Sequence, residues 1–184
     1  MNILRTLLAL SLLAAASARG DEEKSRIEEA ILQDIMKNTK VSVETLEEAA
    51  LAKCFAAPFY RATIASQSGS GSMKRKAVYA KTGDGLQKIS DPGTDAEIEG
   101  LADMVNPAFA LKAEADGETM MTAFKTLFPG CFDDKVDPRI SRDGTKWEFI
   151  ADSFFKRFSG FEVTTDPAGK ISSIKRSLNI NGDG

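Results

Sequence analysis

The sequence predicts an α+β fold in which an antiparallel sheet, built from hairpins, packs against several amphipathic helices. Several segments carry apolar residues at helical spacing. Other segments are rich in β-branched and aromatic residues and flank Gly- and Ser-rich turns, as hairpin strands do. The 184 residues are 42% hydrophobic, which is enough for one ordinary core. We therefore expect one α+β domain over residues 19–184.

Residues 1–18 have the three parts of a secretory signal peptide. Arg5 supplies the positive charge, residues 6–16 form an apolar run, and Ala16-Ser17-Ala18 is a small-residue cleavage site. The run of about 11 residues is short of the roughly 20 that a spanning helix needs. We expect cleavage after Ala18, an exported protein (secreted or periplasmic) and no membrane span in the mature chain. A retained membrane anchor is the less favoured alternative.

Five helices are expected. The first covers residues 21–37, where Ile27, Ile31 and Ile35 recur at helical spacing. The pattern Thr-x-x-Glu, typical of a capping box, predicts three further helix starts. These are Thr45 with Glu48, Thr94 with Glu97, and Thr145 with Glu148; the helices end before Pro58, before Asn106-Pro107 and before Ser159-Gly160. The fifth helix covers about 117–128 and ends at Pro129-Gly130.

The segment 146–158 has two interpretations. As a helix it has a cap at Thr145 and a stop at Ser159-Gly160. As a strand it places Trp147, Phe149, Ala151 and Phe155 on one face. The helix matches more apolar positions, so we favour it.

Strands are expected between the helices, because two pairs of β-rich runs each flank a turn. They are 59–66 and 76–89 around the Ser-Gly-Ser-Gly-Ser turn at 68–72, and 161–165 and 170–180 around the turn 166–169. Residues 109–115 form a weaker candidate strand, and 130–144 is expected to be a loop.

Composition excludes several kinds of chemistry. The chain has no histidine, so Ser-His-Asp hydrolysis, Cys-His proteolysis and histidine-ligated zinc are all excluded. We expect no metal and no cofactor. The formal net charge of −3 becomes about −4 when Arg5 leaves with the signal peptide, and a field of that sign does not attract nucleic acid.

Cys54 and Cys131 are the only cysteines. In an oxidising compartment they suffice for one disulfide, which we favour over two buried thiols that act as small apolar residues. Closing a loop of 77 positions contributes roughly 4 kcal/mol in the chain-entropy model.

Two stretches resemble a known superfamily. Residues 51–60, Leu-Ala-Lys-Cys-Phe-Ala-Ala-Pro-Phe-Tyr, lead from helices into a strand, and residues 160–174 form a long terminal hairpin. Both are similar to parts of the cone-shaped, cystatin-like (NTF2-like) α+β superfamily, over about a third of the chain. The resemblance implies a helix-covered curved sheet. Members of that superfamily include enzymes, binding subunits and ligand carriers, so the resemblance leaves the function open.

A small set of residues has catalytic potential. A carboxylate among aromatic side chains, such as Asp152, can have a raised pKa and act as a general base, with Tyr60 or Tyr79 orienting a substrate. In the favoured helix, however, Asp152 lies on the solvated face. Eight of the eleven phenylalanines lie between Phe124 and Phe161, where they form either an apolar pocket or, as we favour, an ordinary core.

These observations favour an exported, non-catalytic domain that binds a ligand or a protein partner through the sheet face or the first hairpin. On that hairpin Lys74-Arg75-Lys76 form a small basic patch, although such charges also protect an edge strand from aggregation. The alternative is a small metal-free pocket enzyme, of isomerase or hydrolase type, that uses a carboxylate and a tyrosine.

Overall fold

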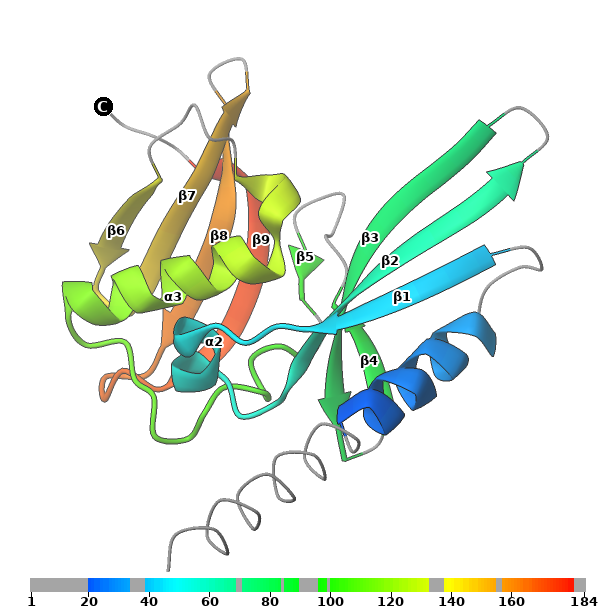
Figure 1. The fold of residues 1–184 in the computed structure, drawn as a ribbon. Coiled ribbons are helices and arrows are strands. Elements are labelled where there is room, and N and C mark those ends of the chain that lie inside the picture. The colour runs from blue at the N-terminus through cyan, green and yellow to red at the C-terminus, as the bar shows by residue number, and fades with distance from the viewer. Residues whose placement is uncertain are drawn as a thin grey trace, which may run out of the picture. The chain divides into compact units, whose positions relative to one another are not determined.

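A computed structural model gives the structure of the chain and confirms the α+β class (Figure 1). It describes residues 20–33, 39–68, 71–83, 85–89, 96–98, 100–132, 138–154 and 157–180. These residues fall into two compact units, and each is described by itself. Unit 1 contains the described residues of 1–45 and 60–77, and unit 2 contains those of 46–59 and 78–184.

Nine strands form two sheets, and the strand pairs with a described register are all antiparallel. The first sheet has the order β1-β2-β3-β4, with β1 (Thr39–Thr45), β2 (Phe59–Ser68), β3 (Gly71–Thr82) and β4 (Gly85–Ile89). The second has the order β5-β9-β8-β7-β6, with β5 (Ala96–Glu97), β6 (Arg139–Asp143), β7 (Lys146–Phe154), β8 (Arg157–Thr165) and β9 (Ile171–Ile180). The helices are residues 20–33, α2 (Ala49–Cys54), α3 (Glu114–Leu127) and the 3-10 turn η1 (Pro129–Cys131).

In unit 1 the helix of residues 20–33 is bonded to the first two strands. Ile27 and Ile31 are buried. The Tyr60 hydroxyl of β2 donates to Glu23 at 3.1 Å, and the Val43 N–H of β1 donates to Glu28 at 2.9 Å. Because β1 is an edge strand, the Glu28 carboxylate satisfies a backbone donor that would otherwise face solvent. The predicted helix over 21–37 is confirmed as far as residue 33, and residues 34–38 lie outside the described part.

In unit 2, α3 packs against one face of the second sheet, as Figure 1 shows. The centre of the Phe124 ring lies 5.2 Å from the ring centre of Phe149 and 4.5 Å from the ring centre of Phe161. Gly117 allows the close approach, since a Cβ there would lie 3.1 Å from the Trp147 ring. These phenylalanines are core residues, as we favoured. Trp147 is buried as well, and its indole N–H has no hydrogen-bond partner among the residues that the structure describes. The Arg142 guanidinium lies 4.8 Å from its ring centre.

The favoured helix over 146–158 is wrong, and the strand alternative is right for the described residues. The segment enters β7 through a tight turn at Gly144, whose φ of +57° suits glycine. Trp147 and Phe149 then alternate with Lys146 and Glu148, so the aromatic side chains face the core and the charged ones face outward. Aromatic residues on a pleated surface gain more from this packing than a single cap contributes.

The predicted capping box of Thr45 with Glu48 is also absent, and Thr94 of the box with Glu97 lies outside the described residues. Thr45 ends β1 opposite Tyr60, and Glu48 is itself the N-cap of the short helix α2. Glu97 lies in β5, and the turns that follow it close through i→i+3 bonds such as Leu101 N–H to Ile98 O. Gly100 at φ +68° interrupts any continuous helix there.

Most of the predicted strands are confirmed. β2, β8 and β9 match the predicted runs, and the predicted run 76–89 is two strands, β3 and β4. The expected strand over 109–115 is wrong, because α3 begins at Glu114 and the preceding residues are not in a strand. The expected loop 130–144 contains β6, whereas its residues 133–137 lie outside the described part.

Candidate functional site

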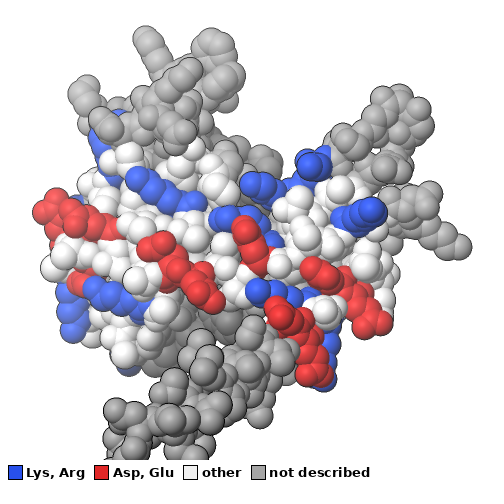
Figure 2. Space-filling model, in the orientation of Figure 1, with Lys and Arg blue, Asp and Glu red and all other residues white. Residues whose placement is uncertain are grey.

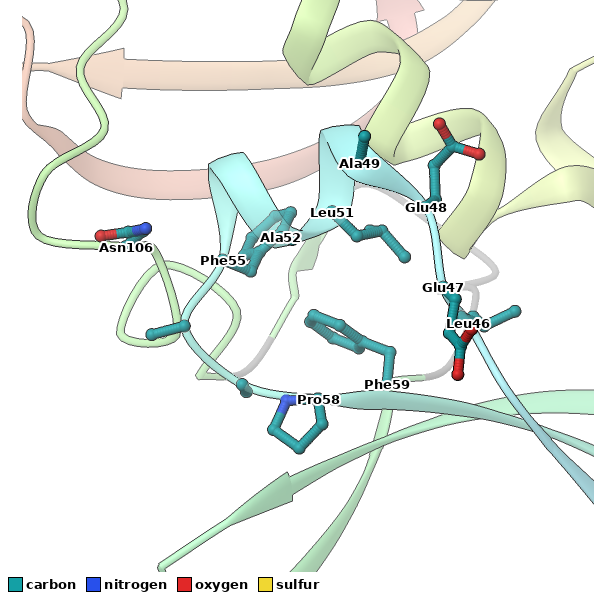
Figure 3. Close-up of a pocket in the computed structure, with 12 residues that line it drawn as sticks. Leu46, Glu47, Glu48, Ala49, Leu51, Ala52, Phe55, Pro58, Phe59 and Asn106 are labelled. Carbon is teal, nitrogen blue, oxygen red and sulfur yellow. The ribbon is translucent and has the colours of Figure 1, made fainter. Parts of the chain in front are cut away.

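An open groove of about 620 Å³ lies in unit 2, between α2 and the start of β2 (Figure 3). It is formed by one continuous segment, residues 46–59, with Asn106 at one end. We call it the 46–59 groove. Its lining residues are Leu46, Glu47, Glu48, Ala49, Leu51, Ala52, Phe55, Ala56, Ala57, Pro58, Phe59 and Asn106.

Backbone hydrogen bonds fix the shape of the groove. The Ala56 N–H donates to Met104 O, and the Asn106 N–H donates to Cys54 O, both at 2.8 Å. The Leu46 N–H donates to Phe59 O at 2.9 Å and brings the two ends of the segment together. The groove is thus part of the folded backbone of unit 2.

The floor of the groove is apolar. Leu51, Phe55 and Phe59 are 2–3% exposed, and the two aromatic rings meet edge to face with centres 5.4 Å apart. Figure 3 shows Leu51 and Phe59 pointing toward the space between α2 and Pro58. The side chains around this floor are small, namely Ala52, Ala56 and Ala57. The apolar surface that solvent reaches is therefore that of these alanines together with Leu46 and Pro58, and the three floor residues lie buried beneath it.

Two carboxylates stand at one end of the groove. Glu47 and Glu48 are adjacent and exposed, and within the described part of the chain neither carboxylate makes an ion pair or a hydrogen bond. Glu48 is the N-cap of α2 but makes no side-chain capping bond. The Lys53 ammonium of α2 instead donates to the Thr119 hydroxyl of α3 at 3.5 Å. The groove therefore combines an apolar floor with uncompensated negative charge.

The predicted catalytic residues do not line this groove. Burial, together with the hydrogen bond to Glu23, raises the pKa of Tyr60 to about 12. Tyr79 is half-buried on β3, opposite Lys88. Asp152 lies on β7 opposite Ser159, just after a register shift, and its side chain is outside the described part. Tyr60 belongs to unit 1, whereas Tyr79 and Asp152 belong to unit 2.

Cys54 and Cys131 both lie in the buried core of unit 2. Burial raises the pKa of the Cys54 thiol to about 12, so this thiol is protonated at neutral pH and is a poor nucleophile. The structure describes both cysteines and contains no disulfide between Cys54 and Cys131. The disulfide that the sequence predicts stays a prediction.

The outward face of the second sheet carries a polar network. Ser141, Glu148, Glu162 and Lys175 are cross-strand neighbours on four adjacent strands. Lys146 bridges the two facing glutamates, at 3.1 Å from Glu148 and 3.2 Å from Glu162. Glu148 and Glu162 both raise the pKa of the Lys146 ammonium. The positive charge of Lys146 in turn offsets the repulsion between the two carboxylates. These charges satisfy one another, unlike Glu47 and Glu48.

The basic run of the first hairpin is exposed at Lys74, Arg75 and Lys76. On the α3 side of unit 2, Figure 2 shows acidic and basic side chains interspersed. Among the described residues, no group of three or more acidic or cysteine side chains is placed to hold a metal ion. The described helices also include none that is long and apolar enough to cross a membrane.

Sequence reasoning missed the groove although it singled out the segment 51–60. The residues between Phe55 and Phe59 are Ala-Ala-Pro, and small residues between two aromatic ones were the available signal. Comparison with protein-family models, with curated protein sequences and with solved structures found no match to the chain.

Proposed function

We propose that this chain is an exported, non-catalytic α+β domain that binds a ligand or a protein partner in the 46–59 groove. The observation that carries the proposal is the open groove, in which small apolar residues are accessible above the buried Leu51, Phe55 and Phe59. Next to it stand two carboxylates that have no partner among the described residues. A concave apolar surface with a few polar groups is the usual form of a binding site. Export and the cystatin-like resemblance belong to the same proposal.

Binding has more support than catalysis because the reactive groups are poorly placed for chemistry at neutral pH. The chain has no imidazole. Burial raises the pKa of both Cys54 and Tyr60 to about 12, so neither group ionises at neutral pH to act as a nucleophile or base. The metal-free pocket enzyme remains the second proposal, and it requires Asp152 to reach a cavity together with a tyrosine.

Groove binding is tested with a fragment screen on the chain of residues 19–184, followed by amide NMR. We expect apolar fragments to shift the amide signals of Leu51, Phe55 and Phe59. In an Ala52→Arg variant these shifts disappear, because a long charged side chain then stands over the groove at an exposed helical position with little change in helix propensity.

The matched control is Ala168→Arg, the same substitution at an exposed turn residue outside the groove. Fragment shifts that persist in Ala52→Arg, or turnover of a bound small molecule, would contradict the proposal.

A further inference from the structure

We infer that the occupant of the 46–59 groove is a polypeptide segment in which a bulky apolar side chain stands next to a lysine or arginine. This inference rests on the function proposed above and adds the chemistry of the partner. Three features of the groove support it: its open form, its apolar floor and the charge at one end.

The open form favours a chain passing over the groove. Small-molecule sites enclose most of the ligand surface. The 46–59 groove is open to solvent along its length, so a small molecule resting on it would keep much of its surface in water. A peptide can place one large side chain against the half-buried Leu46 and Ala57 and gain further contacts along the exposed rim of Ala52, Ala56 and Pro58. Recognition through one anchored side chain with a surrounding rim is common at protein interfaces.

Charge complementarity is the reason for expecting a lysine or arginine next to the apolar side chain. Glu47 and Glu48 lie beside the apolar floor and have no cationic partner among the described residues. Their carboxylates are exposed, so a basic side chain can approach without losing its own hydration. Figure 3 shows the Glu47 and Glu48 side chains pointing in opposite directions, so a lysine or arginine next to the anchor would meet one of the carboxylates. An acidic neighbour would be repelled.

A second copy of this chain is a competing occupant, because its exposed run Lys74-Arg75-Lys76 is also basic. That run lies within β3, whose backbone is already part of the first sheet, so it is not a free segment that could lie along the groove of another copy. The inference therefore commits to a different polypeptide.

The test is selection of a random peptide library displayed on phage against the immobilised chain of residues 19–184. We expect the selected peptides to pair an aromatic or large aliphatic residue with Lys or Arg. Their synthetic forms should bind the Glu47→Gln/Glu48→Gln variant roughly threefold more weakly, as the loss of one exposed charge pair would give, and Ala52→Arg not measurably. A Glu29→Gln/Glu114→Gln variant has the same net charge and should bind as the unmodified chain does.

The outcomes separate the inference from the proposed function. Peptides without basic residues that still lose binding in Ala52→Arg would overturn the inference and leave groove binding in place. Dodecyltrimethylammonium below its micelle concentration binding more tightly than every selected peptide would also overturn it, in favour of a small cationic amphiphile. Concentration-dependent self-association that Glu47→Gln/Glu48→Gln abolishes would replace the partner with a second copy. Peptides that bind all variants equally would overturn both proposals.

Discussion

Gly169 joins two parts of unit 2 at a point where a side chain has no room. Its φ is +85°, and a Cβ there would lie 2.7 Å from the Leu111 carbonyl oxygen. The same glycine accepts a hydrogen bond from the Leu111 N–H at 2.9 Å, so the two backbone segments are in contact. Neither backbone can move away without losing that bond.

We expect Gly169→Ala to be clearly more destabilising than Gly144→Ala. Gly144 also has a positive φ, +57°, but a Cβ there would meet no atom within 4 Å. Gly144→Ala should therefore cost only the conformational strain, about 1–2 kcal/mol. Gly169→Ala adds a backbone clash and should cost at least about 1 kcal/mol more. Urea unfolding measures both, and equal losses would show that the Leu111 contact has no energetic role.

Tyr60 should ionise at a higher pH in the folded protein than an exposed tyrosine does. Its pKa of about 12, compared with about 10 for an exposed tyrosine, means that the folded state holds the proton more tightly than the unfolded chain. The associated stability is present below pH 10 and is lost as the pH rises toward 12. We expect the tyrosinate absorbance step near pH 12 to vanish in Tyr60→Phe and to remain in Tyr79→Phe. A Tyr60 step near pH 10 in folded protein would contradict the burial of its hydroxyl.

At the scale of elements, α3 has half of a capping box. Asp116 accepts hydrogen bonds from the N–H groups of Lys112 and Ala113, at 3.1 and 3.0 Å. The N-cap residue itself is Ala113, which has no side-chain acceptor. We expect Ala113→Ser to stabilise the protein by about 1 kcal/mol, as measured by thermal unfolding. A loss of stability would show that the serine hydroxyl does not reach the free N–H groups of the first turn.

The backbone hydrogen bond from Ala113 contributes most to holding the pKa of Asp116 below its ordinary value. A lowered pKa in the folded state gives stability that is present above pH 4 and is lost as the pH falls through the folded value. In Asp116→Ala, acid unfolding should therefore depend less steeply on pH below 4 than in the unmodified chain. Glu114→Ala, at an exposed position in the same helical turn, is the control.

The sequence predicted the burial of residues better than their secondary structure. Trp147 was expected to face the core and is buried, and so is Phe149, which only the less favoured strand interpretation placed on the same face. The predicted helix around them failed because Thr-x-x-Glu is a local pattern, whereas strand pairing depends on partners far along the chain. Trp147, for example, pairs with Arg142 across a tight turn and with Val163 on β8. The turn at Asp143-Gly144 was a usable hairpin signal.

The groove was harder to predict than the burial of single residues, because its shape also depends on contacts between distant segments. The sequence shows that residues 51–60 are apolar, but the bonds from Ala56 to Met104 and from Asn106 to Cys54 decide which side chains stay accessible. Those contacts join segments about 50 positions apart, and local periodicity does not reveal them. Glu48 was visible as part of an apparent capping box, and the place of Glu47 and Glu48 at the rim of the groove emerges only in three dimensions.

At the scale of the whole molecule, the proposed export has two measurable consequences. The protein recovered from the secreting compartment should begin at Arg19, as intact-mass measurement would show. After denaturation under non-reducing conditions it should contain no titratable thiol, since Cys54 and Cys131 lie in one buried cluster and are expected to be bonded there. An intact chain retaining residues 1–18 would contradict export, and two thiols in the exported protein would contradict the disulfide.

The chain has a single tryptophan, Trp147, and it lies in the core of unit 2. Its emission is therefore a natural spectroscopic probe that reports on one unit alone. Comparing the fluorescence melting curve with circular dichroism, which records both units, would show whether the two lose structure together or in succession. No label or engineered reporter is needed for that experiment.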